Sequence, residues 1–243
     1  MAKQTGIEWT DATWNPWHGC IKVSPGCKNC YMYRDKIRYG QEPMNVVRSK
    51  TTFNDPLSWQ TPTLIFTCSW SDWFIEAADA WREEAWNIIR QTPLHTYQIL
   101  TKRPERILKN LPDDWYDGWD NVWIGVSIEN QKYVFRKDML VSVPSKVRFL
   151  SVEPLLGPVD LGSLKGIHWV ITGGESGPGA RPMNPKWAID IKNQCLASNV
   201  PYFHKQNGGT FKVEDAWGGR HLEGRTWDGM PAVLLNQPIQ TAF

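Results

Sequence analysis

Strand-sized and helix-sized segments alternate along most of this 243-residue chain, and this alternation restricts the possible folds more than any other feature. Short runs rich in β-branched and aromatic residues have the length of buried strands and lie at 63–67, 96–100, 122–127, 147–152, 168–172 and 201–204. Helical patterns lie between them at 29–39, 78–91, 103–108, 131–140 and 185–198. With a short first strand near Gly6–Thr10, this order predicts an α/β fold, a full or partial (β/α) TIM-type barrel of about six to seven parallel strands.

Polar residues follow nearly every predicted strand, and this favours a barrel over an open doubly wound sheet, which has the same alternation. In a barrel the carboxyl ends of all strands converge on one face, where active sites are built. We therefore expect one site assembled from many strand ends. The last stretch has little periodicity, so we predict a barrel over 1–207 and a C-terminal extension over 208–243 packed on it.

The composition is that of a globular protein, with 41% hydrophobic and 21% charged residues and no apolar run long enough to span a membrane. A net charge of +2 is too balanced to indicate a nucleic-acid-binding protein by itself. No basic segment followed by an apolar one precedes Ile7, so we expect a cytoplasmic protein. The five cysteines are then expected to be free thiols, of which Cys68 and Cys195 serve packing.

The strongest chemical signal is a group of three cysteines, Cys20, Cys27 and Cys30, spaced C-x6-C-x2-C in a loop before a predicted helix. A structural zinc ion requires four ligands, and His18 could supply the fourth. An iron–sulfur cluster held by three cysteines would instead leave one iron open for another ligand. The spacing alone favours neither the zinc site nor the cluster.

The place of this loop, after the first strand and before the first helix of a predicted barrel, resembles the radical S-adenosylmethionine (SAM) superfamily. In that superfamily three cysteines hold a [4Fe-4S] cluster whose free iron binds the amino and carboxylate groups of SAM. The superfamily spacing is C-x3-C-x2-C, so the resemblance rests on the C-x2-C half, on Tyr31 and on the architecture. The strings TWNP, GCIKVSPGCKNCY, SVEPLLGP, ITGGESGPGARPM and RTWDGMP, between Trp9 and Pro231, also resemble a phage-encoded, radical-SAM-like family of uncharacterised proteins.

The resemblance implies two cofactors, a [4Fe-4S] cluster held by Cys20, Cys27 and Cys30, and SAM. The superfamily has a GGE-type motif after its second strand, whereas Gly173–Glu175 follows roughly the sixth strand here, so we do not transfer that role. By strand order, the residues implied to contact SAM are Ser69, Ser71 and Asp72 after the second strand, and Ser127, Glu129 and Asn130 after the fourth.

Other polar residues at the strand ends are expected to serve the substrate. The expected catalytic residues are Lys102, Glu153 and Glu175, and the expected substrate-binding residues are Arg103, Arg181 and Lys205. For each of them alone, helix capping or a solvated surface charge explains the residue at least as well. The glycine-rich segment 173–181 could likewise bind an anion together with Arg181, or form a tight loop whose glycines adopt positive φ.

The resemblance predicts an enzyme that cleaves SAM with an electron from the cluster and abstracts a hydrogen from its substrate. The expected substrate is a nucleotide or DNA, with isomerisation of an amino-acid-substituted thymine in phage DNA as one such reaction. Flavodoxin or ferredoxin is the expected electron donor, in the host cytoplasm. Two other hypotheses stay open: a non-catalytic zinc-bound nucleic-acid-binding module, and a barrel that has lost its cluster and binds SAM or another small ligand.

The chain also contains 15 tryptophans, with close pairs at Trp14/Trp17 and Trp70/Trp73. Large aromatic residues of this kind belong mostly to a core, with their indole N–H groups paired near the surface. Only a tryptophan beside other site residues is a candidate for stacking on a planar ligand such as a nucleobase.

Overall fold

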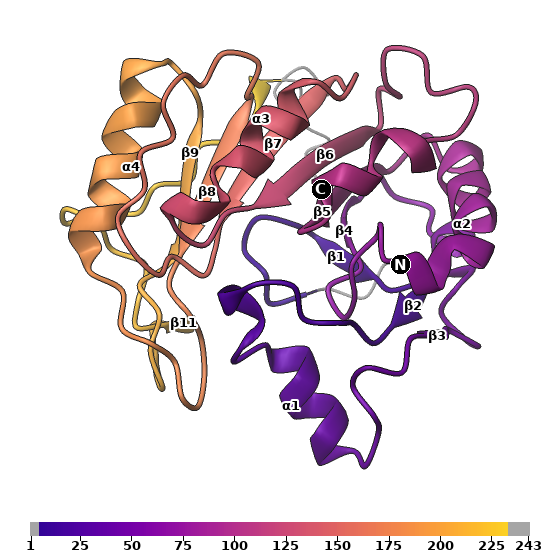
Figure 1. Ribbon diagram of the computed structural model, residues 1–243, viewed down its shortest axis with the longest axis horizontal. Coiled ribbons are helices and arrows are strands. Elements are labelled where there is room, and N and C mark those ends of the chain that lie inside the picture. Colours follow the sequence, from indigo (N-terminus) through magenta and orange to yellow (C-terminus); the bar gives the residue numbers. More distant parts are fainter. Residues whose placement is uncertain (1–4, 233–243) are drawn as a thin grey trace, which may run out of the picture.

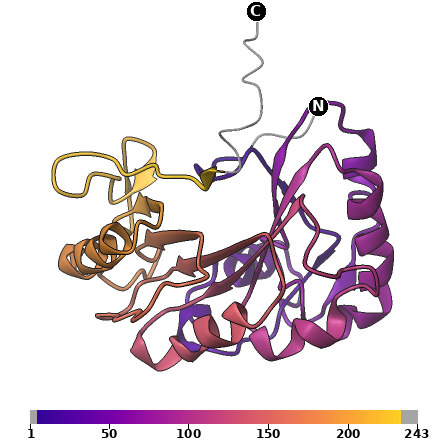
Figure 2. The same ribbon diagram turned by 90° about the horizontal axis from the view of Figure 1, so that it is seen from above.

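A parallel seven-stranded sheet that curves into a half-barrel forms the centre of the computed structural model, which describes residues 5–232 (Figures 1 and 2). All neighbouring strands are parallel, and their order in the sheet follows their order in the chain. The strands are β1 (Ala12–Trp14), β4 (Leu64–Thr67), β5 (Thr96–Thr101), β6 (Val122–Ser127), β7 (Val147–Val152), β8 (Trp169–Gly173) and β9 (Tyr202–Gln206). In the described residues β1 and β9 are edges that do not pair with each other, so the barrel is partial.

The predicted alternation of strands and helices is confirmed for the six later strands, but the expected first strand is wrong. Residues Ile7 to Thr10 form a turn, in which the N–H of Thr10 donates to the carbonyl of Ile7 at 3.3 Å. The strand follows at Ala12–Trp14, after Asp11, whose carboxylate accepts from the N–H of Leu64 at 2.8 Å. A strand of only three residues is too short to give a recognisable alternating pattern.

Of the four α-helices within residues 5–232, three lie along the outer side of the half-barrel, as Figure 2 shows, and α1 lies apart from them (Figure 1). The helices are α1 (Tyr31–Arg38), α2 (Asp79–Gln91), α3 (Phe135–Val141) and α4 (Pro185–Ala197). Asn184 caps α4: its side chain accepts from the N–H of Lys186 at 3.0 Å, and Pro185 takes the first position. The helix expected at 103–108 is instead two short 3₁₀ turns, Pro104–Arg106 and Leu108–Asn110.

Side chains alternate along each strand and therefore build two separate cores. Residues such as Ile124 and Val126 on the outer face belong to the core shared with the helices. The inner face carries a second, aromatic cluster made of Trp9, Phe66, Trp123, Val147, Phe149, Trp169, Ile171 and Phe203. The core role predicted for most tryptophans is confirmed here and for Trp14, Trp17 and Trp73, which are fully buried.

The described part of the expected C-terminal extension packs along β9. The indole N–H of Trp169 donates to the carbonyl of Gly229 at 2.7 Å, and Asp228 forms a bridge with Phe203 of β9. The remainder of the extension, 233–243, lies outside the described residues. The other strands of the described part of the chain form two small antiparallel pairs: β2 (Trp17–His18) with β3 (Val47–Arg48), and β10 (Lys212–Val213) with β11 (Ala216–Trp217).

None of the helices within residues 5–232 combines the length and the apolar character needed to cross a lipid bilayer.

Candidate active site

A pocket of about 560 Å³ opens at the carboxyl ends of the strands, where the sequence predicts the site. Its wall includes residues from the cysteine loop, from the ends of β4 to β7, and from the segments that follow β8 and β9. The predicted site residues that line it are Cys20, Cys27, Cys30, Ser69, Ser71, Asp72, Lys102, Arg103, Ser127, Glu153, Glu175 and Lys205. Glu129, Asn130 and Arg181 do not line it.

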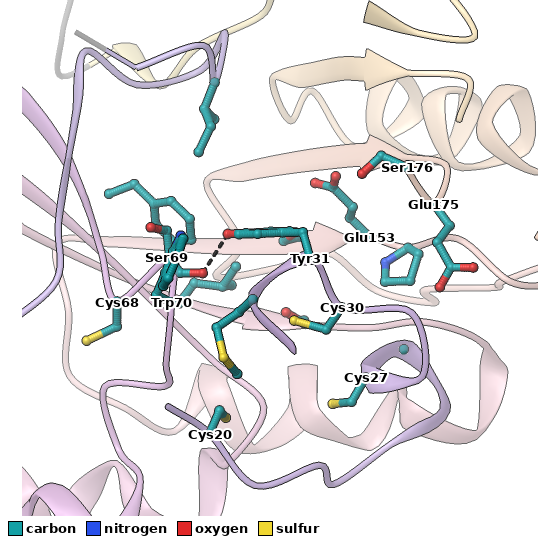
Figure 3. Close-up of a pocket in the computed structure, with 18 of the residues that line it drawn as sticks. Cys20, Cys27, Cys30, Tyr31, Cys68, Ser69, Trp70, Glu153, Glu175 and Ser176 are labelled. Atoms are coloured by element: carbon teal, nitrogen blue, oxygen red, sulfur yellow. Dashed lines mark hydrogen bonds between the residues drawn. The ribbon is translucent and has the colours of Figure 1, made fainter. Parts of the chain in front are cut away.

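The three cysteines of the predicted cluster motif share one end of this pocket. Figure 3 shows the sulfur atoms of Cys27 and Cys30 directed toward the side on which Cys20 lies. A short 3₁₀ turn over Pro25–Cys27 bends the loop. In this turn the N–H of Cys27 donates to the carbonyl of Ser24 at 3.0 Å. Cys30 then takes the position directly before α1. The loop therefore gathers three thiols that are separated in the sequence by six and two residues.

Burial determines the protonation of two of these thiols. It raises the pKa of Cys20 to about 12; nearby Asp72 raises this pKa further, and the Arg103 guanidinium acts in the opposite direction. Burial also raises the pKa of Cys30, against the lowering effect of the Lys102 ammonium group among others. Both are therefore protonated at neutral pH when free, and a metal group must displace these protons on binding.

Asp72 positions Arg103 beside Cys20. Its Oδ2 lies 3.1 Å from Nη1 of Arg103, which is 4.0 Å from the Cys20 sulfur. Arg103 also donates to the carbonyl of Ile21 at 2.8 Å. The Asp72 carboxylate is otherwise occupied, since it accepts from the Thr101 hydroxyl at 2.6 Å and from the backbone N–H groups of Phe74 and Lys102. Asp72 is thus bonded within the protein and holds a cation at the cysteines.

Glu129, predicted to contact SAM, is fully buried behind the cysteine loop. Its carboxylate lies 3.0 Å from Nη1 of Arg136 and 3.5 Å from Nζ of Lys102, and it accepts a short hydrogen bond from the Ser24 hydroxyl. That hydroxyl is 3.7 Å from the Cys27 sulfur. Glu129 therefore supports the loop from behind and does not face the pocket.

Asn130 and the two serines after β4 are also used within the protein. Asn130 caps a short 3₁₀ turn by accepting from the N–H of Lys132 at 3.0 Å. The Ser71 hydroxyl donates to the carbonyl of Gly19 at 2.6 Å. The Ser69 hydroxyl accepts from the side-chain amide of Asn15 at 3.0 Å. The bonds of the two serines tie the segment after β4 to the segment that leads into the cysteine loop.

The glycine-rich segment after β8 is bonded to the cysteine loop. Glu175 accepts two bonds from the Arg181 guanidinium, at 2.9 and 2.5 Å, and one from Asn29 at 2.8 Å. Arg181 also donates to the carbonyl of Pro25 at 2.9 Å. Although burial opposes it, these bonds lower the pKa of Glu175. Arg181 is thus paired, and the tight-loop interpretation describes this segment better than an anion site, with φ of +86° at Gly177.

A different part of the wall carries polar groups with unused bonding capacity. The Lys205 ammonium group donates to Oε1 of Glu153 at 2.6 Å, and both side chains are about one-fifth exposed, 20% and 17% respectively. Ser127 and Ser151 are paired neighbours on β6 and β7, and both line the pocket. Trp70 lines it as well, and is the member of the two close tryptophan pairs that reaches the site.

Zinc coordination by the cysteines and His18 is not formed. Between residues 5 and 232 no three His, Cys, Asp or Glu side chains are grouped closely enough to hold one metal ion, and His18 does not line the pocket. A [4Fe-4S] cluster makes a different demand, because each cysteine binds a different iron and the sulfurs stand further apart than the ligands of one ion. The three thiols line one end of the pocket, with the Arg103 guanidinium near Cys20 and the Lys102 ammonium group near Cys30.

The family model DUF5131, described as a protein of unknown function, matches residues 4–231. The chain belongs to this family. No curated protein and no solved structure matches it. The match covers the half-barrel, the cysteine loop and most of the segment after β9, so the family includes the whole pocket.

Several residues that build the site were missed by the sequence analysis. Ser24 and Asn29 hold the cysteine loop, and no motif marks them because their partners Glu129 and Glu175 are distant in the chain. Arg136 supports the loop indirectly, through its ion pair with Glu129. Ser151 could have been found, because it lies two residues before Glu153 and so on the same side of β7.

Proposed function

We propose that this protein is a radical SAM enzyme in which Cys20, Cys27 and Cys30 hold a [4Fe-4S] cluster. The observation that carries the proposal is the place of the three thiols, at one end of a pocket on the carboxyl edge of a parallel half-barrel. Together, cluster and SAM would supply a 5′-deoxyadenosyl radical able to remove an unactivated hydrogen.

The residues around the pocket suit this chemistry. Arg103 and Lys102 place positive charge beside the cysteines and would offset the charge of the bound thiolates. The bonds from Glu129 through Ser24, and from Arg181 to Pro25, hold the cysteine loop in one geometry. The aromatic cluster on the inner face of the half-barrel makes the part of the pocket wall that it forms apolar, and would limit the entry of water there.

We further propose a nucleotide or a base in DNA as the substrate and flavodoxin or ferredoxin as the electron donor. Partly exposed Trp70 in the pocket wall supports a planar substrate, because an aromatic side chain can stack on a base. Phosphate contacts would make the affinity for DNA fall as salt rises.

Anaerobic purification followed by iron and sulfide analysis is the direct test. We expect brown protein with about four irons per chain and 5′-deoxyadenosine release on addition of SAM and a reductant. Cys27→Ala should lose both properties, while the matched Cys195→Ala, which removes a buried thiol from α4, should keep them.

The two other hypotheses give different results. Colourless protein with one tightly bound zinc would refute the proposal in favour of a binding module. Protein that takes up no iron during anaerobic reconstitution with iron and sulfide, but still binds SAM, would refute the proposal in favour of a barrel that has lost its cluster.

A further inference from the structure

The polar groups of the pocket divide into two sets, and this division indicates where a ligand binds. On the wall after β4 and β5, Ser69, Ser71, Asp72 and Arg103 all bond within the protein. Glu175 is likewise bonded on the segment after β8. Groups of this set maintain the loops, and using them for a ligand would first require breaking these bonds.

The second set retains free bonding capacity. Within residues 5–232, Oε2 of Glu153 accepts no hydrogen bond, and Lys205 Nζ has Glu153 as its one partner at 2.6 Å. The hydroxyls of Ser127 and Ser151 make no hydrogen bond in the same part of the chain, although each residue is only 2% exposed and lines the pocket. All four groups belong to residues that line the pocket, so their free bonding capacity is available to a molecule bound there.

Charge balance selects the kind of molecule. Glu153 and Lys205 already neutralise each other in a partly buried position. An anion or a cation alone would leave an unbalanced charge there, which is costly in a pocket with apolar walls such as Phe66 and Leu100. A group with one ammonium and one carboxylate would give Glu153 a second cation and Lys205 a second anion, and the total charge would stay unchanged.

We propose that Glu153, Lys205, Ser127 and Ser151 bind the zwitterionic amino-acid group of the substrate. Glu153 accepts from its ammonium group, Lys205 donates to its carboxylate, and the two serines bond to polar atoms next to it. The assignment to substrate rests on the proposed function, in which the open iron takes the amino-acid end of SAM. The apolar remainder of the substrate would lie against Trp70, Phe66 and Leu100.

Calorimetric titration of the purified full chain, without added iron or SAM, tests the zwitterion requirement. The probes are L-norleucine, hexanoate and pentylamine, which share an alkyl chain and differ in carrying both charged groups, the carboxylate alone or the ammonium alone. We expect norleucine to bind at least tenfold more tightly than either of the others. Equal binding of all three, or no binding of norleucine, would overturn the proposal.

Variants locate the binding groups. Glu153→Gln and Lys205→Gln should each weaken norleucine binding roughly tenfold to hundredfold, the usual effect of losing a hydrogen bond to a charged group. Lys186→Gln, which changes an exposed lysine on α4, should not alter it. Urea unfolding of each variant identifies a loss of folding. Unchanged affinity in folded Glu153→Gln and Lys205→Gln would refute the assignment.

A second titration distinguishes the two sources of an amino-acid group. Protein reconstituted with iron and sulfide is saturated with SAM before norleucine is added. Norleucine that still binds supports a substrate subsite, whereas displacement by SAM would show that this wall holds the cofactor and would overturn the assignment to substrate. The first titration needs no cluster, so its result is independent of the test of radical SAM chemistry.

Discussion

One methyl group added at Gly174 should damage the site, because backbone atoms fill the space beside this residue. An added Cβ would lie 2.1 Å from the carbonyl oxygen of Asn207 and 2.8 Å from Cα of Gly208. Both obstacles are backbone atoms, so a side-chain rotation cannot relieve the contact. Gly174→Ala must therefore move the start of the segment that bonds to the cysteine loop away from residues 207–208.

The energetic cost follows from the bonds at this position. Overpacking by one methyl group in a rigid setting costs about 1–3 kcal/mol. Gly174 also exchanges two hydrogen bonds with Gln206, at 2.9 and 2.8 Å, and the shift would break them at about 1 kcal/mol each. The expected loss in the free energy of unfolding is about 3–5 kcal/mol, which lowers the melting temperature by roughly 10 °C for a chain of this size.

Urea unfolding of Gly174→Ala beside Gly6→Ala measures this cost. A Cβ at Gly6 meets no atom within 4 Å, so the control adds the same methyl group without the contact. We also expect Gly174→Ala to retain less iron after reconstitution, because its segment supports the cysteine loop through Arg181 and Asn29. Equal stability of the two variants, within about 0.5 kcal/mol, would refute the argument.

Three further measurements test other parts of the structure. Arg136→Met removes the nearer of the two cations paired with the buried Glu129 carboxylate, at 3.0 Å, and leaves Lys102 at 3.5 Å; it should cost about 3 kcal/mol in urea unfolding, and a loss below about 1 kcal/mol would contradict this. Burial lowers the pKa of His204 from 6.5 to about 4. Between pH 6.5 and pH 4 the imidazole therefore binds a proton in the unfolded chain but not in the folded one, and the free energy of unfolding should fall by about 3 kcal/mol as the pH decreases from 6.5 to 4. In His204→Gln the free energy of unfolding, measured by urea unfolding at a series of pH values, should depend less on pH between 4 and 6.5. The same pH dependence in the variant and the natural chain would contradict this. Because burial raises the pKa of Cys20 to about 12, iodoacetamide should modify this thiol of iron-free protein slowly near neutral pH and faster as pH rises, which peptide mass spectrometry can follow.

The later strands could be predicted because each is a buried run bounded by polar residues, and a parallel sheet covered on both faces requires such runs. The first strand could not, since Ala12–Trp14 is short and its pairing with Ile65–Thr67 depends on residues far along the chain. The segment 103–108 was predicted as a helix from local composition alone. In the structure Pro104 begins a 3₁₀ turn there, and the chain does not continue as an α-helix.

The site could be predicted in position but not in the roles of its residues. The carboxyl ends of neighbouring parallel strands meet at one edge, so polar residues after successive strands had to converge. Which of them face the pocket depends on partners that no local pattern reveals. Arg136 and Ser24 determine that Glu129 lies behind the loop, and Asn29 together with Arg181 occupies Glu175.

The polar residues at the strand ends therefore have different roles: some support the loops of the site, and others are available to bind a ligand. Asp72, Glu129 and Glu175 each neutralise an arginine or a lysine, and each of these ion pairs fixes a loop at the cysteine end of the pocket. Ion pairs of this kind restrain the cysteine loop, which has little regular structure and therefore few backbone restraints of its own. Glu153 is the exception: its partner Lys205 faces the same open space, and the pair holds no loop of the cysteine motif. Recognition of a ligand is consequently expected at Glu153, Lys205 and the serines of β6 and β7, whose side chains do not hold the cysteine loop.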